Sequence, residues 1–363
     1  NVLEIPDINS WTNFHNLPVF ITATCEFSRY DNPEHTSAGE LVILNPEGGA
    51  VSMLTTSRLS FAQINFVLNQ RIYDIALNKI SSEKPALGDL MIHAKVPHQN
   101  STKNFVILGD PALRLAVPEM NVLTDEITVM EQPATMSTND TVRGLEHFSV
   151  KGRVAGMDDL TVTSFNGSVN VKLYDKPSVY STLGQAGDSE PAEFKLLDKL
   201  LFDGYANVVD GEFEIEVLIP KDINYQYGTG KISYYAIDSL SLEDASGYYN
   251  NLVIGGYNSS ALDDNAGPEI MAYMNSKRFT QGDKTNENPV FIAEITDPCG
   301  INCIGNSIGH NITAYLDDEV DQIIDLNPYF IPTPGVYNSG KVVYPFYGLS
   351  EGIHTITIKA WDL

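Results

Sequence analysis

The chain has 363 residues, of which 43% are hydrophobic and 19% charged, which is typical of a globular protein with about two to four domains. Its 47 acidic residues outnumber its 22 basic ones and give a net charge of −25, which argues against nucleic-acid binding because phosphates are bound by clustered Lys and Arg. No apolar run approaches the roughly 20 residues that span a bilayer, and no signal-peptide pattern begins at Asn1.

The first part of the chain has the alternating strand and helix pattern of a layered α/β domain. A run of apolar, small and β-branched residues at 19–23 predicts a strand buried on both faces, which ends at Cys25. Further expected elements are a helix through residue 44 capped by Ser or Thr, a buried strand at 50–56, a helix at 61–78 capped by Ser60, a helix at 87–95 and a strand at 105–108. We expect this domain to cover residues 1–117 and to be the second part of a larger sheet.

From residue 118 the pattern changes to short alternating strands separated by Gly, Asn and Asp turns, as in β-sandwiches. Expected strands lie at 128–130, 147–154, 168–174, 194–206, 212–219, 231–238 and 252–255, with a hairpin turn at 207–211. They predict one Ig-like sandwich over residues 118–262. Strands at 269–274, 289–295, 312–316, 341–344 and 354–361 predict a second sandwich over 263–363.

The junction between the two sandwiches is acidic and rich in turn residues. Asp263 and Asp264 are weak candidates for a structural Ca²⁺ site, and a solvated linker is the alternative. We expect no other cofactor. The chain begins without Met close to a core strand and ends in what reads as the last strand of a domain, so we expect an excised part of a longer protein.

Cys25 is the leading candidate for chemistry. It follows a core strand, and in open α/β sheets the ligand crevice lies at the carboxyl ends of the strands. A lone cysteine is also commonly a small buried hydrophobe, so position alone does not decide between the two. A nucleophilic thiol needs a base. The histidines are His15, His35, His93, His98, His147, His310 and His354, and none lies at the end of another predicted strand.

The neighbours of Cys25 supply candidates for a substrate pocket. Glu26 follows the thiol directly, and either orients a substrate amine or is an exposed loop acid. Arg29 is expected to pair with Asp31 at the surface. Thr55, Thr56, Ser57 and Arg58 end the second buried strand at the same sheet edge, so they are expected either to form a pocket wall or to cap the following helix.

Cys299 and Cys303 lie four residues apart in Cys-Gly-Ile-Asn-Cys. They can pair locally in an oxidising compartment, and two thiols without further ligands make a zinc site unlikely.

Four segments carry a resemblance to a known family: the residues around Cys25 (Ile-Thr-Ala-Thr-Cys-Glu-Phe-Ser-Arg-Tyr-Asp-Asn), 49–60, 105–115 (Phe-Val-Ile-Leu-Gly-Asp-Pro-Ala-Leu-Arg-Leu) and 231–236. They resemble the gingipain-like cysteine peptidases. The resemblance implies a caspase-like α/β fold and a Cys-His dyad whose histidine lies in a Gly-His-Gly motif. No such motif occurs in the sequence, so only Cys25 carries over, and we expect residues 1–363 alone to be inactive.

The resemblance is strongest to the sortase-like branch of the family that serves type IX secretion. It implies a cysteine endopeptidase at the Gram-negative cell surface, associated with the outer membrane. Its implied partners are cargo proteins with a C-terminal signal domain and other outer-membrane secretion components. Cleavage would remove the signal, and the acyl group would pass to an amine on surface lipopolysaccharide. The alternatives are a secreted gingipain-like protease and a non-enzymatic adhesin or scaffold.

Overall fold

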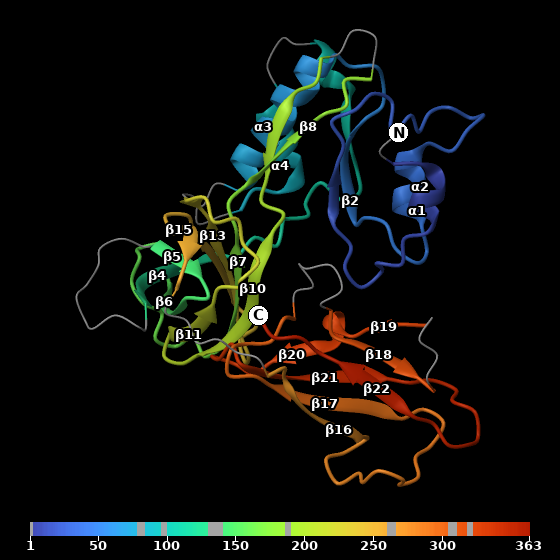
Figure 1. Cartoon of the computed structure of the whole chain (residues 1–363). Helices are drawn as coiled ribbons and strands as arrows, with labels where there is room; N and C mark the ends of the chain where they lie inside the picture. The colour runs from blue at the N-terminus through green and yellow to red at the C-terminus, as the bar shows by residue number, and fades with distance from the viewer. Residues whose placement is uncertain are drawn as a thin grey trace. The chain divides into compact units, whose positions relative to one another are not determined.

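The computed structural model describes residues 3–77, 84–95, 100–129, 141–185, 190–259, 266–303, 311–317 and 322–363. The chain divides into two compact units, Asn1–Val117 and Pro118–Leu363. Figure 1 colours the first unit blue to teal and the second green to red. β-strands are the main secondary structure. The four α-helices of the described residues all lie in the first unit, and the second unit consists mainly of strands.

The first unit is organised around β2 (Ser52–Thr56), in which every residue is buried. β2 pairs in parallel with β1 (Val19–Ile21) and antiparallel with β3 (Phe105–Leu108), so the strand order is β1-β2-β3. The helices of this unit are α1 (Ile5–Asn9), α2 (Ala38–Leu44), α3 (Ala62–Ala76) and α4 (Leu87–Ala94), with a 3-10 turn at Asn100–Asn104.

Helices cover both faces of this sheet. Successive side chains of a strand point to opposite faces, and Met53 packs in a cluster with Ile8 of α1 and Val42 of α2. The next residue, Leu54, packs in a second cluster with α3 and α4, whose buried members include Leu68. Figure 1 shows α1 and α2 on one side of β2, and α3 and α4 on the other. The unit therefore has three layers.

The helical predictions for this unit are confirmed in outline and corrected in detail. At α2, Ser37 is the N-cap and its hydroxyl accepts from the Glu40 N–H in a capping box. At α3 the prediction of Ser60 as the cap was wrong, since Phe61 occupies the N-cap and makes no side-chain capping bond. The strand before Cys25 is also shorter than predicted. It has three residues, all half-buried rather than buried, because β1 lies at the edge of the described sheet.

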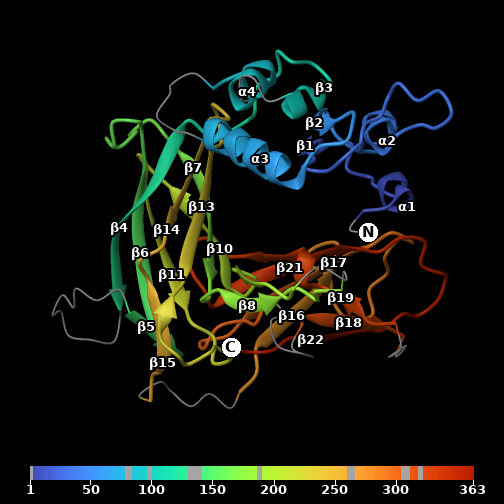
Figure 2. The same ribbon diagram turned by 90° about the horizontal axis from the view of Figure 1, so that it is seen from above.

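The second unit contains two β-sheet bodies. Its first body comprises β4 (Met120–Val129), β5 (Thr141–Gly144), β6 (His147–Ala155), β7 (Gly167–Tyr174), β8 (Ser178–Ser181), β9 (Glu193–Leu196), β10 (Leu200–Val208), β11 (Glu212–Leu218), β12 (Gly228–Thr229), β13 (Lys231–Asp238), β14 (Asp244–Tyr249) and β15 (Val253–Tyr257). One sheet has the order β10-β7-β13-β14-β4-β6-β11, another β12-β15-β5. Figure 2 shows the long strands side by side.

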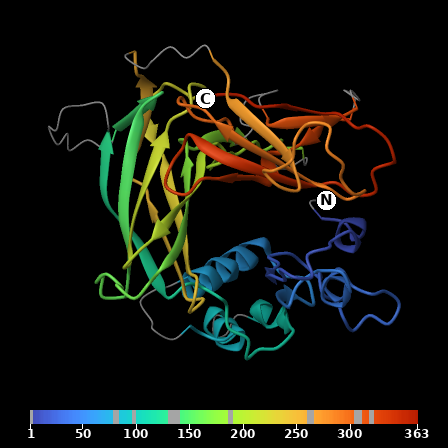
Figure 3. The same cartoon turned by 90° about the horizontal axis from the view of Figure 1, so that it is seen from below.

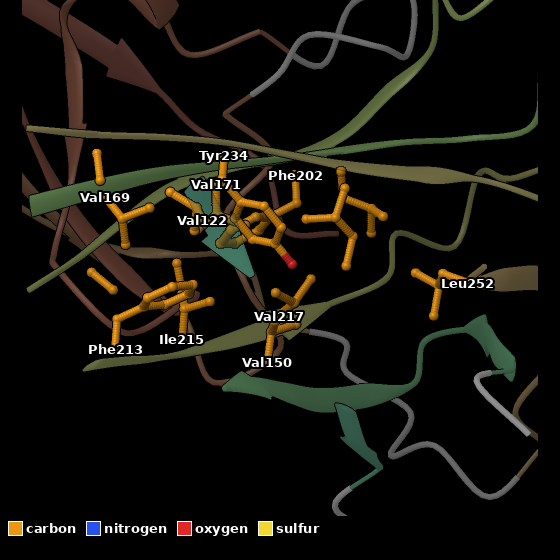
Figure 4. Close-up of a cluster of buried hydrophobic side chains, with 14 of the residues drawn as sticks. Val122, Val150, Val169, Val171, Phe202, Phe213, Ile215, Val217, Tyr234 and Leu252 are labelled. Carbon is orange, nitrogen blue, oxygen red and sulfur yellow. The ribbon is translucent and has the colours of Figure 1, made fainter. Parts of the chain in front are cut away.

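Period-2 patterns build the core of this body. In β11 the acids Glu212, Glu214 and Glu216 alternate with the buried Phe213, Ile215 and Val217. Figure 4 shows these apolar side chains in one cluster with those of other strands, among them Val150 of β6, Val171 of β7 and Phe202 of β10. Burying each such side chain contributes about 1.5–3 kcal/mol.

Several strand predictions in this body were wrong. The expected strand at 194–206 is interrupted and forms β9 and β10, and β8 pairs with β9 as a separate two-stranded ribbon. The chain does turn within the predicted segment 207–211, where Asp210 has φ +52° and Gly211 φ +80°. However, β10 and β11 are the two ends of the sheet order, and the turn between them is closed by an isolated bridge from Val209 to Glu212.

The second body is drawn in orange and red in Figure 3. It comprises β16 (Glu269–Met274), β17 (Val290–Thr296), β18 (Thr313–Leu316), β19 (Ile324–Asp325), β20 (Phe330–Pro332), β21 (Ser339–Pro345) and β22 (Ile356–Lys359), with a 3-10 turn at Asn327–Tyr329. Its sheets, β16-β17-β21-β20 and β19-β18-β22, enclose a core of their own that includes Phe291 and Ile312. Cys299 and Cys303 are both thiols, and burial raises the pKa of Cys303 to about 12.

Candidate active site

Cys25 lies just beyond β1, at the sheet edge where the parallel strands β1 and β2 both end. Its side chain is exposed. The segment around it continues along β2 after the strand ends, because Thr22 N–H donates to Leu54 O at 2.9 Å and Ser28 N–H donates to Thr56 O at 2.9 Å. Residues 22–28 are thus fixed to the most buried strand of the unit, and the thiol projects from that fixed loop.

Buried hydroxyls hold this loop from below. Thr22 Oγ1 donates to Thr55 Oγ1 at 2.9 Å, and Ser28 Oγ lies 2.8 Å from the same Thr55 oxygen. Thr56 Oγ1 donates to Thr24 O at 2.5 Å. The side chains of Thr22, Ser28, Thr55 and Thr56 are all buried. Their hydrogen bonds therefore satisfy hydroxyl groups whose burial without a partner would destabilise the unit.

The backbone turns sharply at the residue after the thiol. Glu26 has φ +54°, in the left-handed region, which costs a non-glycine residue about 1 kcal/mol or more. Behind the turn, Gly39 of α2 donates its N–H to Phe27 O at 2.9 Å. A Cβ on Gly39 would overlap the Ser28 side chain, so α2 packs closely against the loop that carries Cys25.

The thiol contacts the segment that leads into α3. Cys25 Sγ donates to Ser60 O at 2.9 Å, and Ser60 N–H points to Sγ at 3.4 Å. Ser60 precedes Phe61, the N-cap of α3. The nucleophile candidate is therefore positioned by the main chain at the start of a helix.

A cavity of about 460 Å³ opens beside the thiol. Its lining comes from the Cys25 loop and one face of α3: Ala23, Thr24, Cys25, Ser60, Ala62, Asn65, Phe66 and Asn69. Two buried side-chain oxygens of these residues, Ser60 Oγ and Asn65 Oδ1, have no hydrogen-bond partner in the described part of the chain. The positions 62, 65, 66 and 69 repeat at helical spacing, and this is the signal by which sequence reasoning could have found them.

The residues predicted to form a pocket wall, Glu26 and Thr55 to Arg58, lie around the same loop but are not among the residues that line this cavity. Thr56 is fully buried under Thr24, and Ser57 bonds to the 3-10 turn, with its N–H 2.9 Å and its Oγ 3.2 Å from Asn104 O. Arg58 is exposed and donates from Nη1 to Asp31 Oδ1 at 2.8 Å, with a second contact from Nη2 to Oδ2.

The ion pairs around the thiol differ from the prediction. Asp31 pairs with Arg58, which lowers the pKa of the Asp31 carboxyl and raises that of the Arg58 guanidinium. Arg29 pairs instead with Glu26 at 3.6 Å, three residues earlier in the same loop, so the predicted pair between Arg29 and Asp31 was wrong.

The structure gives Cys25 Sγ a main-chain partner rather than an imidazole. His15 and His35 are exposed, and His93 Nδ1 lies 2.8 Å from Asp89 O within α4. His147 and His354 belong to the second unit, where they lie near Glu216 and Asp317. His98 and His310 lie outside the described residues.

The described ranges hold no group of three or more His, Cys, Asp and Glu side chains suited to a metal ion. The two Ca²⁺ candidates, Asp263 and Asp264, lie outside those ranges. Among the helices that the structure describes, none has the length and hydropathy needed to cross a membrane.

Residues 1–116 match the model of Peptidase family C25. The resemblance to gingipain-like cysteine peptidases is therefore confirmed for the first unit, which contains Cys25. Among curated protein sequences none matches the chain.

Among solved structures, the chain is similar to dimeric latent PorU from Porphyromonas gingivalis, at 26% identity over 78% of this chain, with a TM-score of 0.46. It spans 27% of the PorU chain, about a quarter of its length. It is also similar to the Arg-specific cysteine proteinase gingipain R, at 13% identity over 67% of this chain and 48% of the other, with a TM-score of 0.28. A third similar structure is the complex of P. gingivalis RgpB pro- and mature domains, at 13% identity over 67% of this chain and 49% of the other, with a TM-score of 0.27.

Proposed function

We propose that the first unit is part of a cysteine peptidase in which Cys25 is the nucleophile. One observation carries the proposal: within the region that matches Peptidase family C25, an exposed thiol stands at the shared carboxyl edge of β1 and β2 and opens onto a cavity. Chemistry at that edge of an α/β sheet is the common arrangement, because the loops there are free to hold substrate.

The reaction is acyl transfer through a thioester. The Cys25 thiolate attacks the scissile carbonyl carbon, the C–N bond breaks, and the leaving amine takes the proton that the thiol gave up to a base. The main-chain N–H of Cys25 is our candidate donor to the developing oxyanion. The base is a histidine outside residues 1–363, as the family resemblance implies.

The thioester then reacts with one of two acceptors. Attack by water regenerates the thiol and releases a carboxylate, whereas attack by an amine forms a new amide. In our proposal the acceptor is an amine on surface lipopolysaccharide, and the acyl group belongs to a type IX secretion cargo whose C-terminal signal domain leaves. Other outer-membrane secretion components are the proposed partners, and the cell surface is the proposed location. The family match supports the cysteine peptidase, and the transfer to lipopolysaccharide is proposed from the resemblance of the four segments to the sortase-like branch.

Cleavage of a cargo protein by the full-length gene product tests the proposal. Wild type and Cys25→Ala are compared, and products are identified by mass spectrometry with and without an added amine. We expect the wild type alone to release the signal domain and to form the amide when the amine is present. If the products are the hydrolysed ones whether or not the amine is present, the protein is a secreted protease instead. Equal cleavage by both variants would contradict a role of Cys25 as nucleophile. No cleavage by either variant would contradict the peptidase and favour a scaffold.

A further inference from the structure

One face of the seven-stranded sheet in the second unit carries exposed tyrosines. Along β13, Ile232, Tyr234 and Ala236 point into the core, so the residues between them point to the opposite, outer face. On this outer face Tyr235 is 46% exposed, and Tyr205 of β10 is 43% exposed. Single exposed tyrosines are common in strands and need no explanation. These two differ because the sheet aligns them.

The strand register places the two tyrosines in one row. Tyr205 and Tyr235 both lie directly opposite Asn170 of β7, the strand between β10 and β13 (Figure 2). Residues directly opposite one another in neighbouring strands share a face. Since neighbouring strands are about 4.8 Å apart, the two tyrosines start about 10 Å apart with Asn170 between them. The row is also held at the sheet edge, because Gly335 N–H donates to Tyr205 O at 2.6 Å.

Asn170 provides a polar group in the middle of the row. Its Nδ2 donates to Asp203 Oδ1 at 2.8 Å and to Gly204 O at 3.2 Å, and since both partners are acceptors the orientation of the amide is fixed. Within the described ranges its Oδ1 accepts no hydrogen bond. Asn170 is only partly buried, so this oxygen can accept from a hydroxyl group of a bound molecule.

The lysines that β7 and β13 place on the same face are engaged by neighbouring side chains. Lys172 Nζ lies 3.2 Å from Asp203 Oδ2. Lys231 Nζ lies over the ring of Tyr248, 5.1 Å from its centroid. On a chain with a net charge of −25, this face therefore offers an acidic ligand no unpaired cation. Its aromatic rings and its amide match a ligand that is uncharged and has both apolar and hydroxyl-bearing surfaces.

We propose that this face binds an extended, uncharged β-1,4-linked polysaccharide, with alternate sugar rings packed on Tyr205 and Tyr235 and the ring between them hydrogen-bonded to Asn170. A sugar ring has an apolar face of C–H groups that packs on an aromatic ring, and hydroxyls at its rim. In a β-1,4-linked chain successive rings turn over, so alternate rings present the same face, and their separation of about two ring lengths matches the spacing of the tyrosines. The proposal goes beyond the chemistry at Cys25 and is independent of it.

Affinity electrophoresis of the 363-residue chain tests this proposal. Native gels contain hydroxyethyl cellulose or galactomannan, whose backbones are neutral and β-1,4-linked, and the retardation as a function of polysaccharide concentration gives the affinity. Dextran, whose linkages are α, and alginate, which is acidic, are the comparisons. We expect at least one of the two neutral β-1,4-linked polysaccharides to retard the chain, and neither dextran nor alginate to do so.

Variants assign the binding to the row. Tyr205→Ala and Tyr235→Ala are each expected to weaken binding roughly tenfold, because each removes one stacking ring. Tyr235→Phe keeps the ring and loses only the hydrogen bond from Oη to Asp244 Oδ2, so it should bind nearly as well as wild type. Tyr347→Ala is the matched control, since it removes an exposed tyrosine from the second body. Circular dichroism shows whether each variant is folded.

Tyrosine nitration by tetranitromethane tests the wild type without substitution. Bound cellohexaose or mannohexaose, chosen to match the polysaccharide that binds, should protect Tyr205 and Tyr235 and leave the nitration of Tyr347 unchanged, as measured by mass spectrometry. Absence of retardation by both neutral β-1,4-linked polysaccharides, equal retardation by alginate, or retardation that survives both alanine substitutions overturns the proposal. Self-association of the chain that both alanine substitutions abolish, without binding of polysaccharide, would identify a protein interface and overturn it as well.

Discussion

The thiol of Cys25 donates a hydrogen bond to the main-chain oxygen of Ser60 at 2.9 Å, while the N–H of the same residue points back at Sγ at 3.4 Å. A thiolate cannot donate, so ionisation of Cys25 removes the first contact and strengthens the second. These two contacts connect the Cys25 side chain to the backbone that leads into α3.

Ser60→Ala tests how much the Ser60 side chain matters apart from its main chain. Its hydroxyl is buried without a partner in the described residues, so we expect its removal to leave the free energy of unfolding unchanged or raise it by up to about 1 kcal/mol. Urea denaturation measures this. A loss of stability would show that the hydroxyl makes a bond that the structure lacks.

Thr55→Val tests the hydroxyl network beneath the loop. The substitution keeps the shape of the side chain but leaves Thr22 Oγ1 and Ser28 Oγ without their shared partner. We expect a loss of about 1–3 kcal/mol in the free energy of unfolding. Thr36→Val, at an exposed position, is the matched control. Equal effects of the two substitutions would mean that the network does not support the Cys25 loop.

Asp238 makes the second unit sensitive to acid. Its carboxylate accepts from the N–H groups of Asn166, Ser241 and Leu240, which lowers its pKa to about 2. A carboxyl with a depressed folded pKa stabilises above its unfolded value near 3.9, and the effect is lost as pH falls through the folded value. We therefore expect Asp238→Asn to be less stable than wild type at neutral pH, with the difference shrinking between about pH 4 and pH 2 in thermal denaturation. A difference that is constant with pH would contradict this.

His354 makes the stability of the second body depend on pH in the opposite direction. Its Nε2 lies 2.8 Å from Ser350 O and its Nδ1 2.6 Å from Asp317 Oδ2, so both nitrogens donate when the ring is protonated, and its pKa is raised. Such a group stabilises fully below its unfolded pKa near 6.5, and the effect is lost as pH rises through the folded value. His354→Gln should cost most stability near pH 5.5 and progressively less toward pH 9. A cost that grows with pH would rule out the protonated pair.

Strong local patterns were enough to predict much of the fold. The apolar run at 50–56 and the Ser or Thr cap before residue 38 identified β2 and α2, because each pattern has few competing interpretations. In β11 the alternation of Glu with apolar residues predicted the strand nearly to its ends. The half-buried state of β1 was missed because burial depends on which strands flank it, which the order β1-β2-β3 decides.

The site was predictable in part. The position of Cys25 after a strand was visible in the sequence, but its contact with Ser60 joins residues 35 positions apart and depends on how α3 packs. The pairing of Asp31 with Arg58 was missed for the same reason. Arg58 is distant from Asp31 in sequence, and the two side chains meet only once the chain is folded. The helical spacing of the cavity-lining positions 62, 65, 66 and 69 was visible in the sequence, but which face of α3 lies beside Cys25 depends on how the helix packs.

Acylation of Cys25 tests the central claim most directly. The 363-residue chain is mixed with an activated peptide ester, whose leaving group needs no protonation, and the acylated residue is mapped by mass spectrometry. Cys299 serves as an internal control, since it is a thiol outside the first unit. The account predicts a thioester on Cys25 that forms faster than on Cys299 and is absent in Cys25→Ser. Acylation of Cys299 at an equal or higher rate than Cys25 would contradict it.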